Sequence, residues 1–448
     1  MKRSRWFRFK LALALALGAG SAMVLLTIPS SSQAQPADSG IHSTEAQSPI
    51  IDPPIDIWSD GDDNNDPSVA YNSRHDEYLV VWYTQQDAYT YDIWAQRMRG
   101  DGGLEAGFVV ATAPGEIRQS PVVAYSPAQD QYLIAYTNFY TGGLNCDVYA
   151  TRVSWDGSWT SGEFAIADAV DGQLLPAVAY NSRGDEYLAV YVNQWAGGLI
   201  DVYAQRVRAS DGQLLSQNTV ASGVDGARTF PSVAYNPEAY DGAGGYLIAY
   251  SYQDTATHEV EVRSKPAQAD LDGLWLSPET TVCPTGNGQY RSVVAAGPGE
   301  YLAIWAEAVP EPSGKQVRGR RLSLDGTPQE DPAGFDIGEV DTVDEAERQL
   351  ALTYGERYGY LATWHFEESS LPDTIYGRYV LPGQDLASGG QFPIASLSNA
   401  RSDPAVACEP SGDCLVVYSW WDGGDYDIKG RFVRLYRIYV PVVLRNAP

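Results

Sequence analysis

The stretch Asp66-Pro-Ser-Val-Ala-Tyr-Asn-Ser-Arg-His-Asp-Glu-Tyr-Leu-Val-Val-Trp82 decides the fold, because the chain repeats it. Recognisable copies lie at Ser120–Tyr136, Leu175–Tyr191, Phe230–Tyr250, Arg291–Trp305, Gln349–Trp364 and Asp403–Tyr418. Successive copies are about 55 residues apart, a period typical of solenoids, propellers and arrays. Short strands recurring at this period predict one repeating architecture rather than several unrelated domains.

Each repeat contains four segments rich in β-branched and aromatic residues, separated by turn-forming residues. In the first repeat these segments are Ser68–Tyr71, Tyr78–Trp82, Ile93–Met98 and Phe108–Ala111. Asp-Gly pairs such as Asp101-Gly102 supply the positive φ that tight turns between antiparallel strands need. Four antiparallel strands per repeat therefore predict an all-β fold, a seven-bladed β-propeller over residues 50–435.

The two ends of the repeat region indicate how the ring is expected to close. The last copy supplies three strand segments, whereas Ile55-Asp-Ile-Trp58 precedes the first copy and matches the fourth-strand segment Phe108–Ala111. We therefore predict that this N-terminal strand completes the last blade and removes an open sheet edge. The segment Arg437–Leu444 is the alternative candidate for that place.

The residues outside the repeats have the composition of targeting and linker segments. Residues 1–34 join basic residues, an apolar stretch and the small-residue site Ser32-Gln33-Ala34, which predicts a signal peptide. A retained membrane anchor is the alternative. Residues 35–49 are a polar leader that we expect to be disordered, and 436–448 are a C-terminal tail too short to span a membrane. We therefore expect a secreted or cell-surface protein.

The composition is strongly acidic, with 57 Asp and Glu against 30 Lys and Arg and a formal net charge of −27. Such a chain repels nucleic acid and anionic membranes, so neither is expected as a partner. We expect no membrane insertion of the mature chain. A glycan or an extracellular protein is the expected partner.

The sequence has four cysteines, which can form disulfides in a protein that is expected to be exported. Cys408 and Cys414 flank a short turn between two strand segments, where facing positions satisfy disulfide geometry. We predict that they form a bridge worth roughly 2 kcal/mol. Cys146 and Cys283 lie in different repeats, and we expect both to be free thiols.

The usual catalytic signatures are absent: the sequence has no Gly-x-Ser-x-Gly elbow, no His-Glu-x-x-His and no phosphate-binding loop. Asp60, Asp62, Asn64 and Asp66 have the alternating oxygen ligands of a calcium loop, so calcium is the one candidate cofactor. Asn65 replaces the glycine that an EF-hand requires. The alternative interpretation of this loop is a solvated turn.

Aromatic residues also gather where the second strand of each repeat ends, in loops of variable length. In a propeller these loops share one face with the connections between blades. Aromatic rings beside Asp, Glu and Asn side chains can stack on sugar rings and direct hydrogen bonds to them. The predicted ligand-binding residues are Phe139, Trp195, Tyr252, Phe366, Trp420 and Trp421. Local packing at the blade ends is the alternative role.

The repeat also resembles a known family. Tyr78-Leu-Val-Val-Trp82, then Asp92-Ile-Trp-Ala-Gln-Arg97, Asp101-Gly102 and Phe108-Val-Val-Ala-Thr-Ala113 are similar to the repeats of exported bacterial β-propellers of poorly defined role. The resemblance covers about residues 50–435 and rests on repeat consensus rather than on an active-site motif. It implies the propeller fold and an extracellular setting.

Three functions remain open from the sequence. The first is a non-catalytic binding or scaffold module that recognises a glycan or a surface protein through the face carrying Trp195, Trp420 and Trp421. The second is an extracellular hydrolase or lyase with carboxylates at the channel mouth. The third is a structural protein of the cell envelope that is retained by its C-terminal tail.

Overall fold

The computed structural model describes residues 49–140, 145–195, 197–284, 287–308, 315–329, 331–340, 350–366, 373–383, 387–397 and 403–434. The regular elements within these ranges are β-strands and include no helix. None of the described residues forms a helix long and apolar enough to cross a membrane. The expectation of an all-β fold is confirmed. The predicted signal peptide, the predicted leader and the predicted tail lie outside the described residues, apart from residue 49 of the leader.

The strands form successive antiparallel sets. The first two sets are β3 (Asp63–Asn72), β4 (Glu77–Gln85), β5 (Tyr91–Arg99) and β6 (Phe108–Ala111), then β7 (Glu116–Ser126), β8 (Gln131–Tyr140), β9 (Cys146–Ser154) and β10 (Thr160–Ala167). The next two are β11 (Gly172–Asn181), β12 (Glu186–Gln194), β13 (Ile200–Arg208) and β14 (Leu214–Ala221), then β15 (Gly226–Asn236), β16 (Gly245–Asp254), β17 (Val260–Ala269), β18 (Leu274–Leu276) and β19 (Thr280–Thr281).

The remaining strands continue the same pattern. Two further sets are β20 (Gln289–Gly297), β21 (Glu300–Ala308), β22 (Lys315–Ser323) and β23 (Phe335–Val340), then β24 (Leu350–Gly355), β25 (Gly359–Phe366), β26 (Asp373–Val380) and β27 (Ala387–Leu397). The last sheet contains β28 (Ala405–Cys408), β29 (Cys414–Trp421), β30 (Tyr426–Arg434), β1 (Ile50–Ile51) and β2 (Ile55–Trp58).

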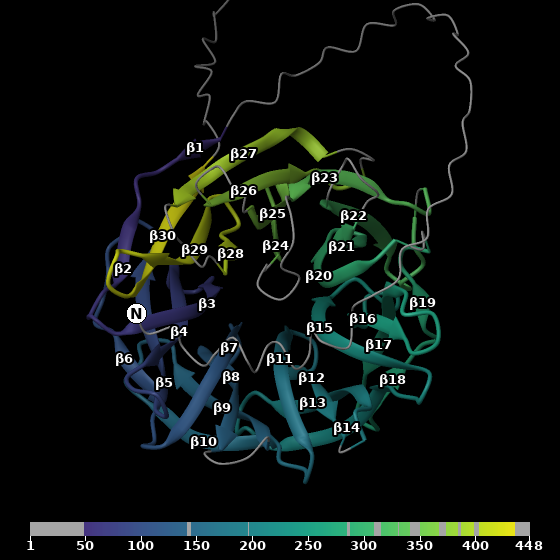
Figure 1. The fold of residues 1–448 in the computed structure, drawn as a ribbon, viewed down its shortest axis with the longest axis horizontal. Helices are drawn as coiled ribbons and strands as arrows, with labels where there is room; N and C mark the ends of the chain where they lie inside the picture. Colours follow the sequence, from purple (N-terminus) through teal and green to yellow (C-terminus); the bar gives the residue numbers. More distant parts are fainter. Residues whose placement is uncertain are drawn as a thin grey trace, which may run out of the picture.

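The sets stand around a common centre, with β3, β7, β11, β15, β20, β24 and β28 innermost (Figure 1). We call the end that carries the turns between first and second and between third and fourth strands the turn end. The opposite end, with the loops between second and third strands and the connections between sheets, is the loop end. Strands such as β4 and β8 are buried nearly throughout, because apolar side chains pack against a neighbouring sheet on each face.

A bulge interrupts the innermost strand in five of the described sets. The residue at the bulge has a left-handed backbone, with φ of 50° at Asp66 and 51° at Phe230, and similar values at Ser120, Leu175 and Arg291. The pairing with the second strand shifts at the same point, for example between Asn65 and Ser68. A left-handed backbone costs a non-glycine residue about 1 kcal/mol, so each bulge is held by its surroundings. The bulge redirects the part of the strand that reaches the loop end.

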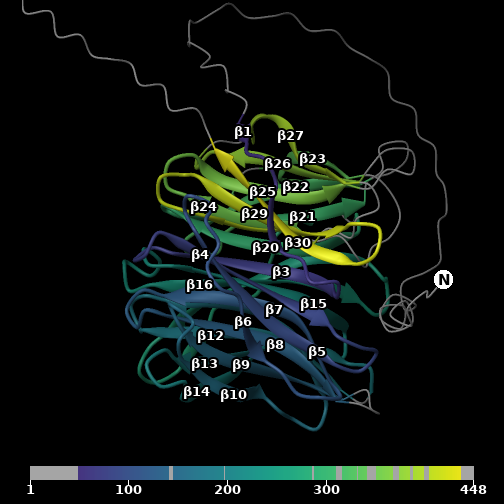
Figure 2. The same ribbon diagram turned by 90° about the vertical axis from the view of Figure 1, so that its left-hand side faces the viewer.

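The first and last sheets lie side by side (Figure 2). β2 pairs antiparallel with β30, through Ile55 with Gly430 and Asp56 with Lys429. Ile57 is buried among side chains of both sheets. Two ion pairs also join this N-terminal segment to β30, Lys429 Nζ to Asp56 Oδ1 at 2.6 Å and Arg434 Nε to Asp52 Oδ2 at 2.8 Å. Segments far apart in sequence therefore share one sheet.

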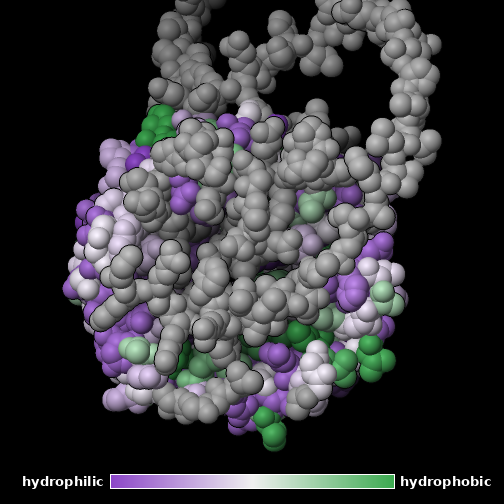
Figure 3. Space-filling view, in the orientation of Figure 1, coloured by the Kyte–Doolittle hydropathy of each residue, from purple (hydrophilic) through white to green (hydrophobic). Residues whose placement is uncertain are grey.

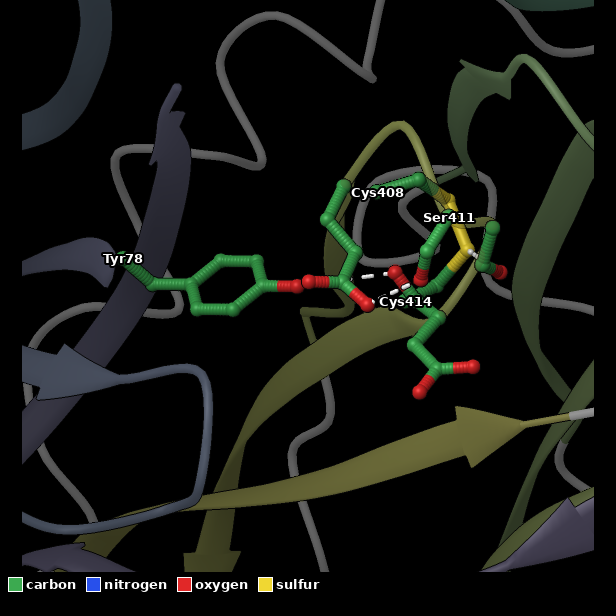
Figure 4. The surroundings of a disulfide bond; sticks show 7 residues. Tyr78, Cys408, Ser411 and Cys414 are labelled. Carbon is green, nitrogen blue, oxygen red and sulfur yellow. Dashed lines mark hydrogen bonds between the residues drawn. A yellow bond between two sulfur atoms is a disulfide. The ribbon is translucent and has the colours of Figure 1, made fainter. Parts of the chain in front are cut away.

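The predicted disulfide between Cys408 and Cys414 is present and closes the turn between β28 and β29. Figure 4 shows Tyr78 of β4 directed at this turn, where its hydroxyl donates to the Asp413 carbonyl at 3.5 Å. Cys146 and Cys283 are free and buried, which confirms the second cysteine prediction. The bridge thus lies at the turn end, where the last sheet meets the first.

Candidate functional site

Trp195, one of the predicted ligand residues, follows directly after β12 at the loop end. Its indole Nε1 donates to Asp201 Oδ2 at 2.7 Å, and its backbone N–H donates to the Leu199 carbonyl at 2.9 Å. The side chain is held at its polar edge, while 39% of the residue remains exposed. Asp201 Oδ1 also accepts the Gly223 N–H at 3.2 Å. One buried carboxylate therefore fixes both the tryptophan and the connection to the next sheet.

A row of polar side chains crosses the sheet beneath Trp195. Gln173, Asn193 and Asp201 are cross-strand partners on β11, β12 and β13, and each is at least nine-tenths buried. Gln173 Nε2 donates to Asn193 Oδ1 at 2.8 Å. Within the described part of the chain, Gln173 Oε1 and Asn193 Nδ2 have no hydrogen-bond partner. The row thus holds one unused acceptor and one unused donor, both costly to bury unpaired.

The neighbouring sheet repeats the same anchor with a different aromatic residue. Tyr140 stands four positions after Tyr136, as Trp195 does after Tyr191, and its hydroxyl donates to Asp147 Oδ2 at 2.7 Å. Asp147, near the start of the third strand β9, is the equivalent of Asp201 near the start of the third strand β13. Burial raises the pKa of the Asp147 carboxyl; the hydrogen bond from Tyr140 opposes this shift and the Asp168 carboxylate adds to it. Tyr140 and Trp195 are therefore matching platforms on adjacent sheets.

Two apolar tips flank these platforms on the connections between sheets. Val170 is 93% exposed and Val224 is 79% exposed. The pairing of Gly172 with Gln194 places the first connection beside Trp195, and the Gly223 hydrogen bond to Asp201 places the second. Exposed aliphatic side chains beside an anchored aromatic ring form an apolar contact surface of the kind that ligands and partners use. We call the surface of Tyr140, Val170, Trp195 and Val224 the Trp195 platform.

A second loop-end surface lies where the first and last sheets meet. It brings the Asp60–Asp63 segment beside the loop that follows Trp421, since a Cβ built on Gly61 would lie 3.8 Å from Asp425 Oδ2. Burial raises the pKa of Asp425, and the neighbouring carboxylates of Asp422, Asp427, Asp63 and Asp60 raise it further. Mutual repulsion of these carboxylates is therefore a property of this surface.

Trp420 and Trp421 belong to the second surface but are more enclosed than Trp195. Trp420 is partly buried against the preceding sheet, and Lys429 Nζ lies 3.8 Å from the centre of its ring. Trp421 contacts Tyr426, with ring centroids 4.9 Å apart. Both surfaces face the loop end, but they stand on different sheets and do not form one site.

The predicted calcium ligands have hydrogen-bonding roles that compete with metal binding. Asn64 Oδ1 accepts from Trp82 Nε1 at 3.0 Å and from Thr84 Oγ1 at 2.7 Å, and Asn64 Nδ2 donates to Asp60 Oδ1 at 2.9 Å. An amide nitrogen directed at the loop cannot ligate Ca²⁺. Asp66 lies in the bulge of β3 and is buried. Across the described residues, no group of three or more His, Cys, Asp or Glu side chains could hold a metal ion.

The other predicted ligand residues are placed in three ways. Tyr252 is buried, with Arg263 3.4 Å and Arg228 5.1 Å from the centre of its ring and its hydroxyl on Asp225. Phe139 on β8 is partly buried. Phe366 contacts Tyr376 edge to face. Tyr252 therefore has a structural role in its sheet, and Tyr140 rather than Phe139 aligns with Trp195.

Figure 3 shows that hydrophilic residues dominate the described surface on the side seen in Figure 1, with hydrophobic residues in separate patches. No described patch on that side merges into one broad apolar face. Contact with a ligand would therefore be local, at platforms of a few side chains.

Comparison with known proteins identifies the fold. No protein-family model and no curated protein matches the sequence. Among solved structures, the phage phi92 endosialidase matches with a TM-score of 0.52 and 7% identity, over 88% of this chain and 70% of that chain. The lectin BP39L from Burkholderia pseudomallei matches with a TM-score of 0.49 and 9% identity, over 82% and 98%. The alpha-L-arabinanase of Penicillium chrysogenum matches with 0.48 and 11%, over 87% and 99%.

These structural neighbours are β-propeller proteins. At such low identities a likeness defines the fold and nothing more. Together with the strand sets around a common centre, the likeness to the phi92 endosialidase places this chain among the all-β propellers (Figure 1).

Proposed function

We propose that this protein is a non-catalytic, extracellular propeller that binds a glycan through its loop end. The observation that carries the proposal is the anchoring of Trp195 by Asp201. Fixing the polar edge of an exposed indole leaves its face free to stack on a sugar ring at little cost in side-chain entropy. The Tyr140–Asp147 pair repeats that arrangement on the adjacent sheet.

The proposal includes the finer architecture. We infer seven blades, with β2 serving as the outer strand of the last. Supporting this, Asp427 at the start of β30 interacts with Ser59 just after β2, as Asp92 does with Thr112 after β6. Export by the segment 1–34 belongs to the same proposal, since the disulfide fits an oxidising compartment.

A hydrolase is the second candidate, favoured by the second loop-end surface. There burial raises the pKa of Asp62 and Asp425, and neighbouring carboxylates raise it further. Burial also raises the pKa of Asp427, against the opposing effects of the hydrogen bond with Ser59 and the charge of Lys429. A carboxyl with a raised pKa can act as a general acid. Release of reducing ends from a bound polysaccharide, lost in Asp425→Asn, would support this candidate instead.

The binding proposal is tested with residues 35–448 on an array of polysaccharides, with calcium and again with a chelator. We expect retention on at least one neutral or basic polysaccharide and a loss of about tenfold in affinity for Trp195→Ala, the equivalent of one aromatic contact. Trp275→Ala is the matched control, because Trp275 is 59% exposed, donates to Asp270 at 2.8 Å and lies at the turn end. Equal losses in both variants, or no retention in either condition, would reject the proposal.

A further inference from the structure

We infer that the Trp195 platform binds an extended polysaccharide whose sugar units carry amino groups, lying across the adjacent sheets β7–β10 and β11–β14. The inference rests on the proposed glycan binding and specifies the chemical class and the length of the ligand. Three observations carry the inference: the repetition of the anchored aromatic ring, the charge around the platform, and the unused hydrogen-bonding atoms beneath Trp195.

Repetition of the anchor indicates a ligand longer than one sugar. Tyr140 and Trp195 occupy equivalent positions of neighbouring sheets, and each is held by the first carboxylate of its third strand. The connection that joins the two sheets carries the exposed Val170 between them in the chain. Two anchored rings on adjacent blades offer separate stacking contacts to different units of one polymer. Such linked contacts raise affinity beyond that of either alone.

Charge around the platform favours a cation over an anion. The segments 168–172, 194–201 and 222–226 contain Asp168, Asp171, Asp201 and Asp225, and no Lys, Arg or His. Two buried arginines lie on the first strands β7 and β15, near the loop end. Arg228 pairs with Asp225 at 2.7 Å while donating to the Gly223 and Gly226 carbonyls, and Arg118, opposite Asn138, pairs with Glu116 at 2.8 Å and with Glu163 at 3.0 Å. Both are therefore committed within the protein. A uronic acid would meet repulsion here, whereas the ammonium group of an amino sugar would meet attraction.

Hydrogen-bonding capacity beneath Trp195 suits a ligand rich in N–H and O–H groups. Gln173 Oε1 can accept and Asn193 Nδ2 can donate, and neither has a partner within the described residues. Asn193 stands two positions before Trp195, on the same face of β12 and opposite Asp201. A hydroxyl or amino group, directly or through an ordered water, would satisfy both atoms. The apolar tips alone would not require such groups.

The test is calorimetric titration of residues 35–448 with four probes: hexamers of glucosamine, N-acetylglucosamine and galacturonic acid, and the glucosamine dimer. We expect the glucosamine hexamer to bind about tenfold more tightly than the N-acetylated hexamer, and the dimer to bind more weakly still. We expect the acidic hexamer not to bind. Raising the salt from about 50 to about 500 mM should weaken the glucosamine hexamer and dimer but not the N-acetylglucosamine hexamer, because salt screens exposed charges.

Variants assign the effect to the platform. Trp195→Ala and Tyr140→Ala should each weaken the hexamer about tenfold, and Asp168→Asn about threefold. Trp275→Ala and Asp272→Asn, both at exposed turn-end positions, are the controls and should change neither affinity nor salt dependence. Tyr140→Phe, which keeps the ring and removes the bond to Asp147, tests whether the anchor itself matters. Thermal unfolding of each variant checks that the fold is intact.

The outcomes separate this inference from the proposal beneath it. If the glucosamine and N-acetylglucosamine hexamers bound with equal affinity and Trp195→Ala weakened both, the glycan-binding function would stand and the amino-sugar class would be overturned. Equal affinity of the dimer and hexamer would overturn the extended site. Binding of the galacturonic acid hexamer would overturn the charge argument. Absence of binding to every hexamer, with retention of another polysaccharide on the array, would overturn the amino-sugar class and keep the glycan-binding function.

Discussion

The two ends of this propeller are built on different rules. At the turn end, neighbouring sheets repeat one connection: Tyr125 and His75 both bond to Asp130, and in the next sheet Tyr180 and Gln129 both bond to Asp185. At the loop end, the anchor that holds Trp195 recurs only as Tyr140 in the described strand ends. Repetition therefore marks the end that holds the sheets together, and departure from it marks the end that is free to specialise.

Charge follows the same division. The turn end carries cations in its turns, such as Arg74, His75, Arg99, Arg183 and Arg208, many of them paired with carboxylates. The residues between second and third strands, at 86–90, 141–145, 196–199, 255–259, 309–314, 367–372 and 422–425, include no Lys or Arg. Ion-paired charges stabilise an assembly of blades, whereas acidic loops without Lys or Arg are better suited to select a cationic ligand.

The largest expected effect comes from breaking a turn-end ion pair. Arg206 and Glu186 are both buried and bonded at 2.8 Å, and Tyr246 of the next sheet also donates to Glu186. Arg206→Met would leave Glu186 buried without its cation, which costs about 3–5 kcal/mol in the free energy of unfolding. Urea unfolding measures this loss.

A loop-end variant is the control for Arg206→Met. Trp195→Ala, at the loop end, should lower the free energy of unfolding by less than about 1 kcal/mol while abolishing much of the binding. The double variant Arg206→Met, Glu186→Leu should recover much of the lost stability, since it removes the unpaired charge. If Trp195→Ala proved as destabilising as Arg206→Met, the division between the two ends would not hold.

A smaller effect is expected at the junction of the first two sheets. His75 Nε2 lies 2.9 Å from Asp130 Oδ2, and the imidazole stacks on Trp155 with ring centroids 3.7 Å apart. His75→Ala should cost about 1 kcal/mol, because it removes one hydrogen bond and one ring contact. His75→Gln should cost less, since Gln129 makes the equivalent bond to Asp185. Differential scanning calorimetry resolves the two; equal destabilisation would contradict the equivalence of the junctions.

Much of the fold was predictable from the sequence, because repetition exposes which positions are equivalent. The predicted segment Tyr78–Trp82 lies within β4, and the predicted Cys408–Cys414 bridge closes the turn expected for it. The recurrence of Arg97 and Arg206 on third strands reflects their pairing with Glu77 and Glu186. Local patterns of this kind are set by one strand and its partner, so sequence alone carries them.

The candidate site was predictable only in part, because it depends on how each strand leaves its sheet. Trp195 was predicted as a ligand residue and is exposed at the loop end, but the residue that aligns with it is Tyr140 rather than the predicted Phe139. Adjacent residues on a strand face opposite sides. Counting four positions from the recurring aromatic residue would have found it. Tyr252 was chosen as a ligand residue although Arg228 and Arg263 enclose it. Contacts with arginines distant in sequence leave no local signal.

The smallest expected effect tests a turn-end junction where like charges meet. Glu409, between the disulfide cysteines, faces Asp413 of its own turn and Asp76 of the first sheet, and it accepts a hydrogen bond from Ser411. Burial raises the pKa of Glu409 above its ordinary value of 4.5, and Asp413 and Asp76 raise it further, against the opposing bond from Ser411.

The sign of the pH dependence follows from that shift. The folded protein holds a proton that the unfolded chain releases near pH 4.5, so this contribution to stability is complete below that pH and is lost as the pH rises through the folded pKa. Glu409→Gln keeps a neutral side chain at every pH. The variant should match the wild type at pH 4 and be more stable at pH 7 by up to about 1 kcal/mol.

Urea midpoints of the two proteins between pH 4 and 7 check this difference, with Glu259→Gln at an exposed loop-end position as the control. A stability difference between the two proteins that is the same at every pH would mean that Glu409 does not lie close to Asp76. A stability difference that grows with pH would show that protonation of Glu409 strengthens the contact between the last and first sheets at the turn end.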